Sequence, residues 1–131
     1  MWSTEDHLKN RIMSSILSIY WLVVASVWYF VNGILHDIFC IINHKKPYDR
    51  DLLRLLMDGH VLILSGAILY LCYLMIKNNI HYGSIIGIIL GLGMIVYCFM
   101  IWPFLKSFVT LIISIMVIIV CIKLYPTPLN K

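Results

Sequence analysis

The chain has 131 residues, of which 62% are hydrophobic and 12% are charged. A soluble domain usually has about 25% charged and about 45–50% apolar residues, so this composition excludes an ordinary soluble fold. The length fits one compact membrane domain. The formal net charge is +4, but most Lys and Arg residues lie at the ends of apolar segments, where they anchor helices at lipid headgroups. They therefore do not indicate nucleic-acid binding.

Four apolar segments predict four transmembrane helices. Their apolar residues are distributed around the whole helix, as expected for helices in lipid. The first segment would be about 48 Å long, whereas a bilayer core is about 30 Å thick, so this helix tilts strongly or emerges from the membrane. It is also too long for the apolar core of a cleavable signal peptide. The four segments comprise residues 12–43, 52–76, 80–102 and 104–125.

Short polar connections separate these segments. Pro47 is expected to end the first helix, and Asp49 or Asp51 can cap the second. Residues 77–79 form a short turn, and Pro103 starts the fourth helix almost without a loop, because proline fits the first turn of a helix. The predicted fold is all-α: a single polytopic membrane domain built as an antiparallel four-transmembrane-helix bundle.

An even number of spans places both termini on the same side of the membrane. Five basic residues fall on each side of the predicted bilayer, so the positive-inside rule gives no orientation. Cytoplasmic termini are expected only because that arrangement is common. The short loops and the Ile-, Lys- and Asn-rich composition favour a multi-pass protein of a bacterial inner membrane.

Three glycines spaced by four residues mark the third segment: Gly83, Gly87 and Gly91. This spacing aligns them on one helix face, which lets another helix approach closely. The face predicts packing against another helix of the same chain or, alternatively, against a second copy or a membrane-protein partner.

A stripe of small and polar residues runs along the first segment and includes Ser18, Tyr29 and Asn32. These residues recur at steps typical of one helix face, so we expect the stripe to face the interior of the bundle. Hydroxyl groups in membrane helices also bond to their own backbone. The stripe therefore needs no bound solute to explain it.

Four ionisable residues form a predicted polar layer: His36, Asp37, Asp58 and His60. The first two helices form an antiparallel hairpin about residue 48, so both histidines should lie at similar depth. Asp58 and His60 are two residues apart and should point to nearly opposite sides of their helix. Only one of them can face a given site.

This layer has two interpretations. Ionisable groups below the headgroups are costly and suggest a functional site, since carboxylate and imidazole can relay protons or ligate a metal or haem. Alternatively, the layer marks the membrane boundary, and Asp58 pairs with Arg54 one helical turn away. No cysteine or histidine spacing typical of a metal site occurs, so no metal or cofactor is predicted.

Three hypotheses for function follow. No catalytic or nucleotide-binding motif is present, and the glycine face favours a non-enzymatic accessory or scaffold subunit of a larger membrane assembly. A small transporter or channel would use the polar layer. A membrane enzyme or redox protein would act on a lipid or quinone through His36, Asp37 and His60.

Overall fold

The structure is a computed structural model that describes residues 4–45, 47–102 and 107–125, with the side chains of residue 13 and of residues 17 onward within these ranges. The described residues form helices and no strands, which confirms the predicted all-α fold. The helices are α1 (Thr4–Asn43), α2 (Arg50–Lys77), α3 (Tyr82–Ile101) and α4 (Phe108–Leu124).

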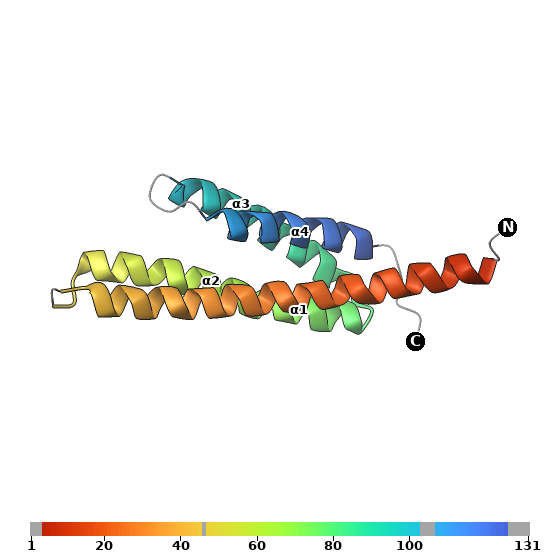
Figure 1. Ribbon diagram of the computed structural model, residues 1–131, viewed down its shortest axis with the longest axis horizontal. Helices are drawn as coiled ribbons and strands as arrows, with labels where there is room; N and C mark the ends of the chain where they lie inside the picture. The colour runs from red at the N-terminus through yellow and green to blue at the C-terminus, as the bar shows by residue number, and fades with distance from the viewer. Residues whose placement is uncertain (1–3, 46, 103–106, 126–131) are drawn as a thin grey trace.

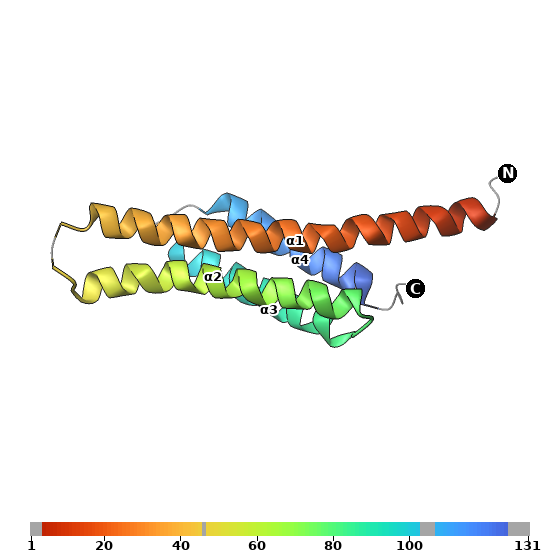
Figure 2. The ribbon, with the colours of Figure 1, turned by 90° about the horizontal axis from the view of Figure 1, so that it is seen from below.

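Two antiparallel hairpins make up the bundle (Figure 1). Helices α1 and α2 form a long hairpin, and the shorter α3–α4 hairpin packs along it, with α2 against α3 and α1 against α4. The turn between α1 and α2 extends well past the end of α3, as both views show (Figures 1 and 2). We call this end of the molecule the turn end. The start of α1 and the end of α4 lie toward the opposite end.

Three helices are long and apolar enough to span a membrane: α1 from Leu17 onward, α2 and α3. Helix α4 is also apolar but has 17 residues, a length of about 26 Å at about 1.5 Å per residue. The three longer helices exceed or equal the thickness of a bilayer core, whereas α4 falls a few ångströms short of it.

The helix bounds differ from the sequence prediction most at the starts of α1 and α4, and by at most two residues elsewhere. Helix α1 begins at Thr4 and has 40 residues, so it is about 60 Å long and extends farther than predicted. Helix α4 begins at Phe108 rather than near residue 104, because Ser107 has a non-helical backbone, with φ −85° and ψ 59°. The predicted role of Pro103 falls outside the described residues.

Close packing of α1 against α2 depends on glycines that face the partner backbone. A Cβ at Gly33 would lie 2.6 Å from the Gly59 carbonyl oxygen, and a Cβ at Gly66 would lie 2.8 Å from the Ser26 carbonyl oxygen. The Ser26 hydroxyl donates a 2.7 Å hydrogen bond to the Gly66 carbonyl. Small residues thus let the two backbones approach closely, as membrane helices do where lipid supplies no hydrophobic drive for association.

The glycine face of α3 is filled within the chain. Gly83, Gly87 and Gly91 are all buried. A Cβ at Gly83 would meet the backbone of α2, 2.9 Å from the Cys72 carbonyl oxygen, and a Cβ at Gly87 would lie 2.5 Å from the Cys121 sulfur of α4. This face therefore seats α3 between α2 and α4.

Buried hydroxyl groups join the two hairpins. The Tyr29 and Ser114 hydroxyl oxygens are 2.7 Å apart, and Ser114 donates to the Thr110 carbonyl at 2.7 Å. Because Ser114 has one hydroxyl hydrogen, Tyr29 must donate to Ser114. Ser65 of α2 donates to the Met94 sulfur of α3 at 3.2 Å.

Both ends of α2 carry side-chain or backbone caps. Asp49 accepts a 2.9 Å hydrogen bond from the Leu52 amide, so of the two predicted candidates Asp49 is the N-cap. Beyond Lys77, Asn79 adopts a left-handed conformation with φ 60°. The Ile80 amide then reaches back to the Met75 carbonyl at 2.9 Å, a Schellman termination. This geometry produces the short turn into α3.

Candidate functional site

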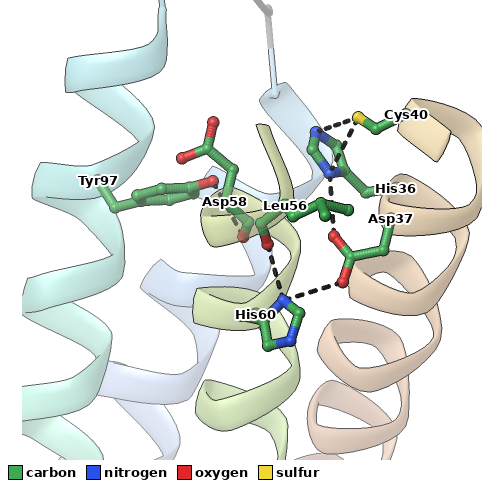
Figure 3. Close-up of polar contacts among 7 residues, drawn as sticks. All are labelled: His36, Asp37, Cys40, Leu56, Asp58, His60 and Tyr97. Carbon is green, nitrogen blue, oxygen red and sulfur yellow. Dashed lines mark hydrogen bonds and ion pairs between the residues drawn. The ribbon is translucent and has the colours of Figure 1, made fainter. Parts of the chain in front are cut away.

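A chain of two histidines and one aspartate joins α1 to α2 near the turn end. Asp37 points from α1 between His36 and His60 (Figure 3). Its Oδ2 atom lies 3.1 Å from His60 Nδ1, and its Oδ1 atom lies 3.7 Å from His36 Nδ1. His60 Nδ1 also lies 2.8 Å from the Leu56 carbonyl, so its N–H is shared between two acceptor oxygens.

Space for Asp37 comes from a glycine on α2. A Cβ at Gly59 would overlap the Asp37 Oδ1 atom. The side chain of Asp37 is 14% exposed, whereas that of His60 is 72% exposed. The series of contacts from His36 through Asp37 to His60 therefore connects an interior carboxylate to the outer face of α2. Among the described residues, Asp37 Oδ1 is buried and has no hydrogen-bond partner.

Asp58 lies on a different side of α2 from His60, toward α3 (Figure 3). The Tyr97 hydroxyl donates a 3.4 Å hydrogen bond to the Asp58 backbone carbonyl. Within the described part of the chain, Asp58 forms no ion pair with Arg54, so the expected pairing along the helix surface is absent. Three residues of the predicted layer are thus linked through Asp37, and the fourth, Asp58, lies apart from them.

A cleft of about 770 Å³ lies between the α1–α2 hairpin and α3 at the turn end. His36 and Asp58 line it from opposite helices, whereas Asp37 and His60 are not part of its wall. Its apolar lining residues are Phe39, Cys40, Leu55, Leu62 and Ile101. Its polar lining residues are Asn32, His36, Asn43, His44, Asp51, Arg54, Asp58, Tyr97 and Ser107.

Charged residues in the cleft follow one face of α2. Asp51, Arg54 and Asp58 are spaced by three and four residues and all line the wall, as helical periodicity requires. Asp58 contacts Tyr97, which lies four residues before the end of α3, or about 6 Å at about 1.5 Å per residue. If α3 just spans the bilayer core, Asp58 lies about 6 Å inside the core boundary, and Arg54 and Asp51 lie at that boundary or beyond it toward the turn end.

The residues of the predicted stripe on α1 occupy three different surroundings. Tyr29 is 1% exposed and bonds to Ser114 in the middle of the bundle. Asn32 lines the cleft. Ser18 lies near the opposite end, where the Lys123 ammonium donates to its hydroxyl at 3.3 Å. The stripe therefore does not form one continuous polar path.

Sequence reasoning missed part of the cleft wall. From the sequence, Asp51 is predicted only as a possible cap and Arg54 only as an ion-pair partner, and Tyr97 has no predicted role. The available signal was the spacing of Asp51, Arg54 and Asp58 on one helix face. The approach of Tyr97 has no local signal, because it depends on how α3 packs against α2.

The described residues contain no group of three or more His, Cys, Asp or Glu side chains that could hold a metal ion. The thiol of Cys40 lies 3.8 Å from Nδ1 and 3.9 Å from Nε2 of His36, so it is nearly equidistant from the two ring nitrogens. In a catalytic pair the thiol is directed at one ring nitrogen and the carboxylate at the other, whereas here the thiol is directed at neither nitrogen in particular.

Comparisons with known proteins add no relative to this description. No protein-family model matches the chain, and neither the curated proteins nor the solved structures give a match. The fold and site define a four-helix bundle with three candidate membrane spans and one amphipathic cleft.

Proposed function

We propose that this protein is an integral membrane protein that binds an amphipathic lipid in the cleft at the turn end. The observation that carries the proposal is the composition of the cleft wall, where apolar side chains such as Phe39 and Ile101 lie beside charged residues such as Arg54 and Asp58. Ligand sites combine a largely apolar wall with a few polar groups that fix orientation. A membrane lipid has the same division between apolar chains and a polar head.

Insertion in a membrane is supported from both ends of the bundle. The cleft charges lie at the turn end, and an aromatic cluster of Tyr20, Tyr70 and Tyr73 lies near the other end, with the Lys77 ammonium 5.8 Å from the Tyr73 ring centre. Aromatic and basic residues are typical of membrane–water interfaces. A bacterial inner membrane and cytoplasmic termini remain predictions, which reporter fusions at the two ends of the chain can test.

A subunit role, favoured by the sequence alone, keeps the lack of a catalytic motif as support, but the glycine face no longer calls for a partner. The glycine face of α3 was the feature that suggested a partner, and Gly83, Gly87 and Gly91 pack against α2 and α4 of the same chain. Copurification from native membranes still tests this hypothesis, since a stoichiometric protein partner would favour it.

Transport and catalysis have less geometric support than binding. Below the cleft, Leu22, Leu69 and Val117 are each at most 1% exposed and fill the core, so a path would require oligomerisation. Catalysis would need an aligned thiol or base, which the arrangement of Cys40 about His36 does not provide. Lipid binding requires neither a path nor an aligned nucleophile.

A pair of matched substitutions tests the proposal. Leu55 and Leu53 are both on α2 and are 42% and 44% exposed, but only Leu55 lines the cleft. We expect Leu55→Trp to fill the cleft and remove bound lipid, whereas Leu53→Trp should retain it. The measurement is lipid retained per protein after purification in a mild detergent, by mass spectrometry. Equal retention in the two variants, or no lipid with the unmodified protein, would overturn the proposal.

A further inference from the structure

We infer that the lipid bound in the cleft has a zwitterionic headgroup that carries a phosphate and a primary ammonium, as an ethanolamine phospholipid does. This inference rests on the proposed function and names the class of its ligand. It is argued from charge complementarity between such a headgroup and the charges along α2. The relevant residues are Asp51, Arg54 and Asp58, which all line the cleft.

These three charges are not neutralised by one another. Among the described residues, ion pairs join His36 and His60 to Asp37 and join His44 to Asp49, and none involves the three charges of the cleft wall. Asp51 and Arg54 are exposed and Asp58 is half-buried, so an unpaired charge is costly mainly at Asp58, beside the apolar wall. A ligand that supplies opposite charges would recover part of that cost.

The order of the three charges along α2 fits a headgroup in which a phosphate has an ammonium next to it. Arg54 lies between Asp51 and Asp58 on the same face, so a phosphate at Arg54 has a carboxylate about one helical turn, or about 5–6 Å, away in either direction. Guanidinium binds phosphate through paired hydrogen bonds. The ethanolamine arm then places the ammonium toward one of the two carboxylates.

The apolar part of the cleft lies where acyl chains would have to lie. Leu62 is farther along α2 than Asp58 and is 5% exposed, and it lines the cleft. Leu62 is also farther from the turn end, so along α2 the wall ends on an apolar residue toward the membrane interior, while Asn32 of α1 lines the cleft at about the same depth. A headgroup at Arg54 therefore directs its chains toward Leu62 and the lipid phase.

Anionic lipids fit this wall less well. Among the described lining residues there are two carboxylates and one guanidinium, so these residues carry an excess of negative charge while the histidines are neutral. A glycerol phosphate headgroup would meet Arg54 but would leave both carboxylates unpaired. We therefore expect an ethanolamine phospholipid to bind more tightly than a phosphatidylglycerol with the same acyl chains.

Native mass spectrometry of the detergent-purified protein, titrated with each of these two lipids, tests the inference. We expect the ethanolamine lipid to bind about fivefold more tightly, which is the ratio supplied by one partly exposed ion pair. Asp58→Asn and Asp51→Asn together should reduce this preference to about one, whereas Asp58→Glu, which keeps the charge, should retain it. Arg54→Gln should weaken both lipids by a similar factor, and Lys77→Gln at the far end of α2 should weaken neither.

The outcomes separate this inference from the proposed function. Equal binding of both lipids by the unmodified protein, with loss of both in Leu55→Trp, would overturn the headgroup assignment and leave lipid binding intact. Tighter binding of phosphatidylglycerol would also overturn the assignment. Failure to bind either lipid would overturn both proposals. Circular dichroism of each variant shows whether a loss of binding reflects a loss of helix.

Discussion

Alanine at Gly33 should weaken the packing between α1 and α2, whereas alanine at Gly93 should not. At Gly33 a Cβ would lie 2.6 Å from the Gly59 carbonyl oxygen and 2.9 Å from the Ile63 amide nitrogen. Both atoms belong to the backbone, so no side-chain rotation relieves the overlap. At Gly93 a Cβ would have no such neighbour within 4 Å, which makes Gly93 a matched control.

The change in the free energy of unfolding follows from one stabilising and two destabilising contributions. Replacing glycine by alanine inside a helix stabilises it by about 1 kcal/mol through backbone entropy. At Gly33 the new Cβ would be about 0.8 Å closer than the 3.4 Å at which ordinary contact begins, and such overpacking costs about 1–3 kcal/mol. Separation of the helices would also stretch the nearby bond from Ser26 to Gly66, which contributes about 1 kcal/mol. We expect a net loss of about 1–3 kcal/mol for Gly33→Ala, and a gain of up to about 1 kcal/mol for Gly93→Ala.

Reversible unfolding in mixed micelles with increasing dodecyl sulfate, followed by circular dichroism, measures both free energies of unfolding. The reasoning predicts a lower unfolding midpoint for Gly33→Ala and an equal or higher one for Gly93→Ala. If the two variants unfold at the same midpoint, the close backbone contact between α1 and α2 does not exist as described.

The remaining predictions concern polar bonds, a cap and the glycine face, all measured by the same unfolding assay. Ser114→Ala should destabilise the protein by about 1–3 kcal/mol because it leaves the buried Tyr29 hydroxyl without a hydrogen-bond partner. Tyr29→Phe should cost only about 1 kcal/mol, since Ser114 keeps its acceptor at Thr110. A larger loss of stability for Tyr29→Phe than for Ser114→Ala would contradict the assigned donor. Asp49→Ala should cost about 1 kcal/mol through loss of the α2 cap, and no change would exclude that cap. Gly87→Leu should disrupt packing of α3 on α4, and normal stability of this variant would refute the internal role of the glycine face.

Much of the fold could be predicted from local sequence. Length and hydropathy identify the helices, and Asp49 and the turn at residues 77–79 mark the two ends of α2 through known capping and turn chemistry. Helix α1 ends at Asn43, four residues before Pro47. The contact between α1 and α2 also has a signal in the sequence: Gly59 and Gly66 are seven residues apart, as are Ser26 and Gly33. A spacing of seven is typical of two helices that pack along their length.

The candidate site was predicted only in part, because it depends on relations between helices. Depth in the hairpin predicts that four residues lie near one another: His36, Asp37, Asp58 and His60. It does not predict which of them are in contact. A Cβ at Gly59 would overlap Asp37, so the Asp37 carboxylate can lie where it does only because residue 59 has no side chain. The cleft itself arises because α3 ends before the α1–α2 turn (Figure 1), which no single segment encodes.

Photochemical cross-linking with a lipid that carries a diazirine in its acyl chain tests the central claim most directly. The protein would be reconstituted with a trace of this lipid, irradiated and mapped by mass spectrometry. The account predicts label on cleft residues such as Leu55 and Ile101, displaced by excess unlabelled lipid of the same class. Label spread evenly over outward residues such as Leu53 and Val96, with no displacement, would show that lipid only surrounds the helices and would contradict a lipid site in the cleft.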